Sequence, residues 1–223
     1  MRTQQAKREK RSKGDARIIE EAVDTHIERY LGDISFVLHE EDSPLVHVDV
    51  YVVGATPERP YHCLLTSGMS EKPMPVPKGA GGRYAGLVIC LPPEWPLTME
   101  AWNDEANWWP IRLLKGLARY PHENKTWLYA DHSILWSDPP QPFASSTRMT
   151  SVLLLRPKLI PPDAQVIHVR KNGHIQLWGV YPLHHEELEL KQRQGSSGIE
   201  TLFEENGITE LLDPQRLSVA RLQ

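Results

Sequence analysis

The sequence predicts an α+β fold in which helices pack on a mixed, mostly antiparallel β-sheet. Residues 15–31 and 110–119 carry apolar side chains at the spacing of one helix face, whereas residues 46–53 alternate as a strand does. Several strand-like runs follow one another without an intervening helix, so neighbouring strands can pair antiparallel. Because helices and strands do not alternate as in βαβ units, an α+β class fits better than a doubly wound parallel sheet.

Size and composition are those of one large domain. The chain has 223 residues, 40% of them hydrophobic, and a formal net charge of −4 at pH 7. This apolar content is enough for one sizeable core, and the small charge gives no reason to expect a nucleic acid or membrane partner. We expect a basic flexible arm at 1–14, one domain at 15–216 and a C-terminal tail at 217–223.

The N-terminal segment is basic but does not have the form of a secretion signal. No apolar stretch follows its lysines and arginines, as a secretion signal would require. No run in the chain approaches the roughly 18 apolar residues that span a bilayer. The sequence therefore predicts a cytoplasmic protein.

The first half of the chain is expected to hold one helix and four strands. Asp15 can cap the helix, which Gly32 then ends. Residues 67–83 are rich in glycine and proline and are expected to be irregular. The expected strands are 34–39, 46–53, 61–66 and 84–91, the last of which is a near-continuous apolar run typical of a central strand.

The second half of the chain is expected to mix helices and strands. A short helix over 98–107 leads to a longer helix, in which Pro110 occupies the first turn and after which Pro121 stops the helix. Asn172-Gly173 marks a hairpin turn. The later elements are expected to be strands at 126–136, 151–155, 166–169 and 174–181, helices at 182–193 and from Gly198 to Asn206, and a last short element at 208–212.

Residues 126–136 have an unusual surface for a strand. One face carries Tyr129, Asp131 and Ser133 between larger apolar side chains. Aromatic side chains are enriched at interaction hot spots, and this mixture of polar and aromatic groups is more typical of a binding surface than of a core.

The usual motifs of catalysis and metal binding are absent from the sequence. His47 and Asp49 share a strand face, and Asp131 and His132 are neighbours on another strand, but neither pair belongs to an HExxH or CxxC pattern. Hydrogen bonding on the sheet surface explains these side chains, so we expect no metal and no cofactor. The chain also lacks the GxSxG motif of a serine nucleophile.

Two further features have ordinary explanations. Cys63 and Cys90 lie in apolar runs without a metal-type partner, so buried reduced thiols are expected, although a disulfide is also compatible with the sequence. The glycine-rich stretch 79–82 lacks the GKS or GKT ending of a phosphate-binding loop.

An ordered set of segments makes the chain similar to a known family. Over roughly residues 30–216 it resembles the suppressor of fused family, and in particular the single-domain bacterial members. The segments that carry the resemblance are HVDVYVV at 47–53, ERPYHCLLTSGMS at 58–70, YAGLVICLPPEWPL at 84–97, LLKGLARY at 113–120, ADHSI at 130–134, IQLWGVYPLHHEELEL at 175–190 and GIETLFEENGITELLDPQR at 198–216.

The resemblance implies a protein-binding scaffold that is not known for catalysis. Animal members hold a transcription factor through a short peptide, which adds as a β-strand in a cleft between two domains. Their binding residues include a Tyr at the end of the GLARY helix and an Asp in the following D-H strand, which correspond to Tyr120 and Asp131. We expect this chain to lack the second domain that closes the cleft.

The resemblance also implies a bacterial role. Bacterial relatives are interpreted as immunity proteins of polymorphic toxin systems, so the implied partner is a protein: a toxin domain or a peptide segment. We therefore expect a non-enzymatic protein-binding module, an immunity protein, with Tyr120 and Asp131 on its binding surface and no catalytic residue. Two other classes stay open. One is a structural or oligomerising regulator, and the other is a metal-dependent or acid/base enzyme built on His47, Asp49, Asp131 and His132.

Overall fold

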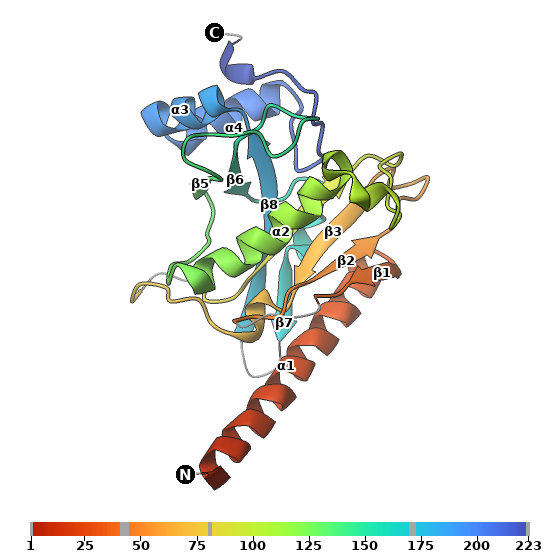
Figure 1. The fold of residues 1–223 in the computed structure, drawn as a ribbon, viewed down its shortest axis with the longest axis vertical. Coiled ribbons are helices and arrows are strands. Elements are labelled where there is room, and N and C mark those ends of the chain that lie inside the picture. Colours follow the sequence, from red (N-terminus) through yellow and green to blue (C-terminus); the bar gives the residue numbers. More distant parts are fainter. Residues whose placement is uncertain (1, 41–44, 80–81, 170–172, 222–223) are drawn as a thin grey trace.

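A single eight-stranded sheet forms the centre of the protein (Figure 1). The computed structural model describes residues 2–40, 45–79, 82–169 and 173–221. Along the sheet the order is β1-β2-β3-β4-β8-β6-β5, and β7 pairs with β8 beside this path. The strands are β1 (Ile34–Leu38), β2 (Asp49–Val53), β3 (His62–Ser67), β4 (Ala85–Leu91), β5 (Ser133–Leu135), β6 (Ser151–Leu155), β7 (Val166–Val169) and β8 (Gly173–Leu183).

The sheet is mixed, because β4 and β8 run parallel. The other strand pairs in the described ranges are antiparallel, which confirms the predicted α+β class with a mostly antiparallel sheet. The hairpin predicted around Asn172-Gly173 is present as β7 and β8. Residues 170–172 of its turn, like residues 80–81 of the glycine-rich stretch, lie outside the described residues.

Helices cover both faces of this sheet. None of those in the described ranges is both long and apolar enough to cross a membrane. The helices are α1 (Arg2–Tyr30), α2 (Glu105–Glu123), α3 (His185–Gln194) and α4 (Ser196–Glu205), with short 3-10 helices η1 (Met69–Glu71), η2 (Ala101–Asn103), η3 (Pro162–Ala164) and η4 (Val219–Arg221).

Alternation along the strands divides the core between the two faces. In β2, Val50 and Val52 join the apolar cluster under α2, whereas Tyr51 and Val53 join the cluster under α1. A third cluster packs β6 and the end of β8 against α3 and α4. Figure 1 shows α2 crossing one face of the sheet, with α3 and α4 at the end of the molecule opposite α1.

Two prolines that the sequence assigns to the ends of α2 lie inside it. The helix begins earlier than predicted, where the Asp104 side chain accepts a hydrogen bond of 2.9 Å from the Ala106 N–H. Pro110 consequently lies beyond the first turn and cannot donate to the Ala106 carbonyl. The Ser146 hydroxyl donates to that carbonyl instead, at 3.2 Å. Pro121 is accommodated within the last turn of the helix.

Several other predicted boundaries are wrong. α1 already begins at Arg2 rather than at Asp15, so the helix includes the stretch predicted as a flexible arm. The helix predicted over 98–107 is reduced to η2 and the start of α2. β8 continues past Pro182, which delays the start of α3, and residues 208–212 form only an isolated bridge to β4. The division of the chain into arm, domain and tail remains a prediction.

The largest difference concerns the strand predicted over residues 126–136. Only Ser133–Leu135 is a strand, while 126–132 is irregular. Asp131 has a φ of 67°, which is the left-handed region of the backbone map. Because an extended strand cannot pass through that conformation, the regular structure starts only after it.

Candidate functional site

The turn before β5 places Asp131 at the beginning of a terminal strand of the sheet. The backbone on either side of this left-handed residue is pinned to β6: the Asp131 N–H donates to the Leu154 carbonyl at 2.8 Å, and the Leu154 N–H donates to the His132 carbonyl at 2.9 Å. Asp adopts the left-handed conformation more readily than most residues do. The turn therefore fixes an exposed carboxylate at one end of the sheet.

A second carboxylate meets Asp131 from helix α4. Glu200 lies beside Asp131, and the pKa of Glu200 is raised, first by burial and then by the Asp131 charge. Lys158 opposes this shift, but its ammonium already pairs with Glu204 at 2.7 Å. The Asp131–Glu200 pair is therefore a negative site to which a proton or an external cation would be attracted.

Apolar side chains flank this carboxylate pair. Tyr129 is 42% exposed and packs edge-on against Trp178, with ring centroids 5.1 Å apart, and Leu135 on β5 is 38% exposed. β5 ends the strand order, and β6 is its only strand partner within the described part of the chain. An unpaired strand edge can add a further strand from another chain.

Tyr120 lies on α2, not on this turn. It is half-buried and packs against the core cluster on the α2 face, and its carbonyl accepts hydrogen bonds of 3.0 Å from the backbone and side chain of Asn124. Among the described residues, no hydrogen bond joins Tyr120 to Asp131. The structure pairs Asp131 with Glu200, a residue that sequence reasoning missed because nothing local links the two positions.

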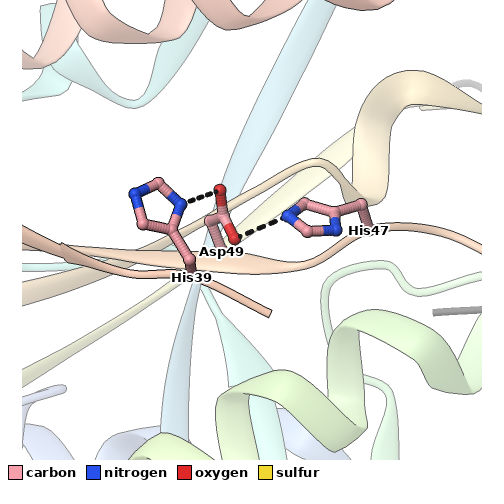
Figure 2. A group of neighbouring side chains, drawn as sticks. All are labelled: His39, His47 and Asp49. Atoms are coloured by element: carbon pink, nitrogen blue, oxygen red, sulfur yellow. Dashed lines mark hydrogen bonds and ion pairs between the residues drawn. The ribbon is translucent and has the colours of Figure 1, made fainter. Parts of the chain in front are cut away.

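His47 and Asp49 belong to a different cluster, at the opposite end of the sheet (Figure 2). Asp49 Oδ1 lies 2.9 Å from His47 Nε2, and Asp49 Oδ2 lies 3.0 Å from His39 Nδ1. Figure 2 shows the two imidazoles on either side of the carboxylate. His39 was not among the residues singled out from the sequence.

The polypeptide around this cluster is held by charged side chains. The Glu40 N–H donates to Asp49 Oδ1 at 3.0 Å, and the Glu40 carboxylate accepts from the Val48 N–H at 2.9 Å and pairs with Arg119 of α2. Lys115 of α2 donates to the carbonyl of His39 at 3.2 Å; burial lowers the pKa of Lys115, and the Asp49 charge opposes that shift. These contacts tie the cluster to α2.

The enzyme alternative built on four residues is wrong as a single site. β2 and β5 are five strand steps apart in the sheet order, which corresponds to about 24 Å at the usual spacing between strands. His132, moreover, is engaged by Trp127, with its Nδ1 3.2 Å from the Trp127 carbonyl. His47 and Asp49 therefore do not share one site with Asp131 and His132.

Cys63 and Cys90 are free and buried, as predicted. They are opposite each other on β3 and β4, with their sulfur atoms 3.8 Å apart. Burial raises the pKa of the Cys90 thiol, which keeps it in the unreactive thiol form.

Comparison with solved structures shows the same fold in three proteins. A suppressor of fused homolog from Neisseria gonorrhoeae FA 1090 matches with a TM-score of 0.65 and 16% identity, over 90% of this chain and 96% of that one. The Sufu–Fu complex matches with a TM-score of 0.63 and 14% identity, over 92% of this chain and 93% of that one. Drosophila Suppressor of Fused matches with a TM-score of 0.57 and 15% identity, over 80% of this chain and 44% of its own length.

Family comparison agrees with this structural likeness. No curated protein sequence matched the chain. The family model described as suppressor of fused protein (SUFU) matches residues 44–217. This span includes β2 to β8 and the helices α2, α3 and α4. The chain is therefore a member of the suppressor of fused family.

Proposed function

We infer that this protein is a non-enzymatic protein-binding module of the bacterial cytoplasm, an immunity protein that binds and neutralises a cognate toxin. Its binding surface is the β5 edge, with Asp131 as the charged contact. Tyr120, which is half-buried on α2, is proposed as a separate aromatic contact outside that edge. The observation that carries the proposal is the Asp131–Glu200 carboxylate pair beside an unpaired strand edge and the exposed Tyr129 ring.

Family and chemistry both support a protein partner. A protein of the same fold is found in the Sufu–Fu complex. An extended partner segment can add to the free edge of β5 through backbone hydrogen bonds, while Tyr129 and Leu135 supply apolar contact area. The facing carboxylates favour a partner that brings a lysine or arginine, because a charge-assisted hydrogen bond would relieve their repulsion.

The experiment has two stages. Affinity purification of the tagged protein from its native cell identifies the partner, and the products of the neighbouring genes are then searched for a toxin domain to compare with it. The partner is then produced separately, its affinity for wild type and variants is measured, and its toxicity is tested in cells that co-express each of them.

Asp131→Arg is the decisive variant, and Asp33→Arg is its control. Both reverse one exposed aspartate, but Asp33 precedes β1 at the other end of the sheet. We expect Asp131→Arg to weaken binding by about 30-fold or more and to abolish protection, as loss of a hot-spot residue does. Asp33→Arg should behave as wild type. Tyr120→Phe tests the tyrosine hydroxyl alone, since the ring keeps its packing.

The possible results separate the parts of the proposal. Binding that survives Asp131→Arg would show that another surface is used. A partner that binds but is not toxic would remove the immunity role and leave the binding role. Melting curves of each variant must show a folded protein, because arginine is less suited than aspartate to the left-handed conformation of residue 131.

A further inference from the structure

The cluster at the β1–β2 edge brings together the ligand types of a transition-metal site. One ligand atom from each of His39, His47 and Asp49 lies within 4.8 Å of the other two. Two imidazoles and one carboxylate are a ligand set of zinc sites, and imidazole excludes Mg²⁺ and Ca²⁺ as the preferred ions.

The spacing of these atoms is close to what a metal ion requires. Ligand atoms about 2.0–2.1 Å from a tetrahedral zinc ion lie about 3.3 Å from one another. The two nitrogen–oxygen distances of the cluster are 2.9 Å to Asp49 Oδ1 and 3.0 Å to Asp49 Oδ2, and one ligand atom from each of the three residues lies within 4.8 Å of the other two. Small rotations of the imidazoles, whose side chains are 71% exposed for His39 and 44% exposed for His47, would bring all three atoms around one ion.

The carboxylate at the centre of the cluster is fixed before any ion binds. Its side chain is only 11% exposed, and the Glu40 N–H holds its Oδ1 at 3.0 Å. Gly68 allows the His47 backbone to lie close by, because a Cβ at Gly68 would be 1.8 Å from the His47 carbonyl oxygen. One rigid ligand with two adjustable ones is a partly preorganised site.

The surroundings of the cluster also suit a cation. The three residues line a pocket of about 270 Å³ together with Glu20 of α1 and Glu71 of η1. α1, the β1–β2 edge and η1 thus surround this pocket, and the carboxylates of Glu20, Glu71 and Asp49 give it excess negative charge. A fourth coordination position facing this pocket can be filled by water or by a carboxylate.

We propose that His39, His47 and Asp49 form a binding site for one divalent transition-metal ion of the zinc class. The ion replaces the two imidazole–carboxylate hydrogen bonds and links the end of β1 to the start of β2. This site is separate from the β5 edge and does not depend on the proposed immunity role.

The test is direct titration of the full chain with metal after treatment with a chelator. Zn²⁺ affinity is measured by competition with a chromophoric chelator, and Co²⁺ reports the coordination through its visible absorption. We expect one equivalent of Zn²⁺ to bind, with affinity reduced by about 10-fold to 100-fold or more in His39→Gln and in His47→Gln. Both positions are exposed enough for these variants to fold.

His168→Gln serves as the matched control, because it also removes one exposed imidazole but lies on β7, away from the cluster. It should bind Zn²⁺ as wild type does. Equal affinity in wild type, His39→Gln and His47→Gln would place the ion elsewhere and overturn the proposal. Absence of Zn²⁺ binding by the wild-type chain at micromolar concentrations would overturn it as well.

Discussion

The β1–β2 edge and the β5 edge of the sheet both carry carboxylates, and they use them in opposite ways. At the first edge, Asp49 accepts hydrogen bonds from two imidazoles and a backbone amide, and Glu40 pairs with Arg119. At the second edge, Asp131 faces the carboxyl group of Glu200. A paired carboxylate stabilises the local fold, whereas facing carboxylates are stabilised only when a proton or a cation joins them.

Because the carboxylates are paired at one edge and face each other at the other, the two edges suit different ligands. A closed network offers preplaced ligands, so a metal ion exchanges existing hydrogen bonds for stronger ones without moving the chain. The Asp131–Glu200 carboxylate pair beside the exposed Tyr129 ring offers negative charge and apolar area. A protein partner can supply a cation to the first and apolar contact to the second. The two proposals thus assign a small cation to one edge of the sheet and a protein to the other.

The largest expected difference between the two edges is in the stability of two glycine variants, one at each edge. Gly68 and Gly82 both have positive φ, but a Cβ at Gly68 would meet the His47 backbone at 1.8 Å, whereas a Cβ at Gly82 would meet the Tyr129 ring at 3.1 Å. We expect Gly68→Ala to lower the free energy of unfolding by at least about 3 kcal/mol, through strain and a backbone clash. Gly82→Ala should cost about 1 kcal/mol, because an exposed ring can move. Urea denaturation measures both values.

Equal losses in the two glycine variants would contradict the expectation that the backbone contact at Gly68 costs more than the ring contact at Gly82. Far-ultraviolet circular dichroism is the control, since a variant that does not fold gives no value to compare.

The second test exchanges aspartate for asparagine at each edge. Asp49→Asn replaces a carboxylate oxygen that accepts a hydrogen bond with an amide that donates one, so we expect a loss of about 1–3 kcal/mol in the free energy of unfolding. Asp131→Asn keeps a residue that tolerates the left-handed conformation and removes repulsion with Glu200, so its effect should be within about 0.5 kcal/mol of zero. A larger loss at Asp131 than at Asp49 would reverse the assignment of the two edges.

Much of the fold follows from local patterns in the sequence. The alternation in residues 46–53 correctly identifies β2, whose side chains divide between the clusters under α2 and α1, because successive side chains of a strand point to opposite faces. The apolar run of residues 84–91 correctly identifies β4 as a strand that is buried along its length. The segment 126–132 could not be predicted in this way. Its β-branched and aromatic residues favour a strand, yet burial of Leu128 in the core and the left-handed Asp131 bend the chain out of register.

The two sites differ in how many of their residues can be predicted from the sequence. The pattern of residues 126–136 points to Asp131 as a surface residue, and the family resemblance gives it a binding role. Its partner Glu200 lies in α4, four strands later in the chain, so nothing local links the two positions. His39, in contrast, can be predicted from the sequence. The antiparallel register places Leu38 opposite Val50, so the next position brings His39 beside Asp49. Pairing the two predicted strands before searching for ligands would have found it.

The smallest expected effect concerns the pH dependence of the open edge. The pKa of Glu200 is raised in the folded state by burial and by Asp131, so Glu200 favours folding only while it is protonated. Its contribution is fully present below the unfolded pKa of about 4.3 and is lost as the pH rises through the folded value. Glu200→Gln cannot ionise, and it should therefore raise Tm by about 1–3 °C at pH 7, a small effect because solvent screens this partly exposed pair.

Calorimetry across pH 3.5 to pH 7 distinguishes this repulsion from a simple packing change. The advantage of Glu200→Gln should shrink as the pH falls and vanish near pH 4, where the wild-type residue is protonated as well. Glu204→Gln is the control, since Glu204 is paired with Lys158 and its loss should be neutral or slightly destabilising at pH 7. A Tm increase that stays constant with pH would mean that the two carboxylates do not repel each other. The β5 edge would then lack the negative charge to which a cationic group of the partner is expected to bind.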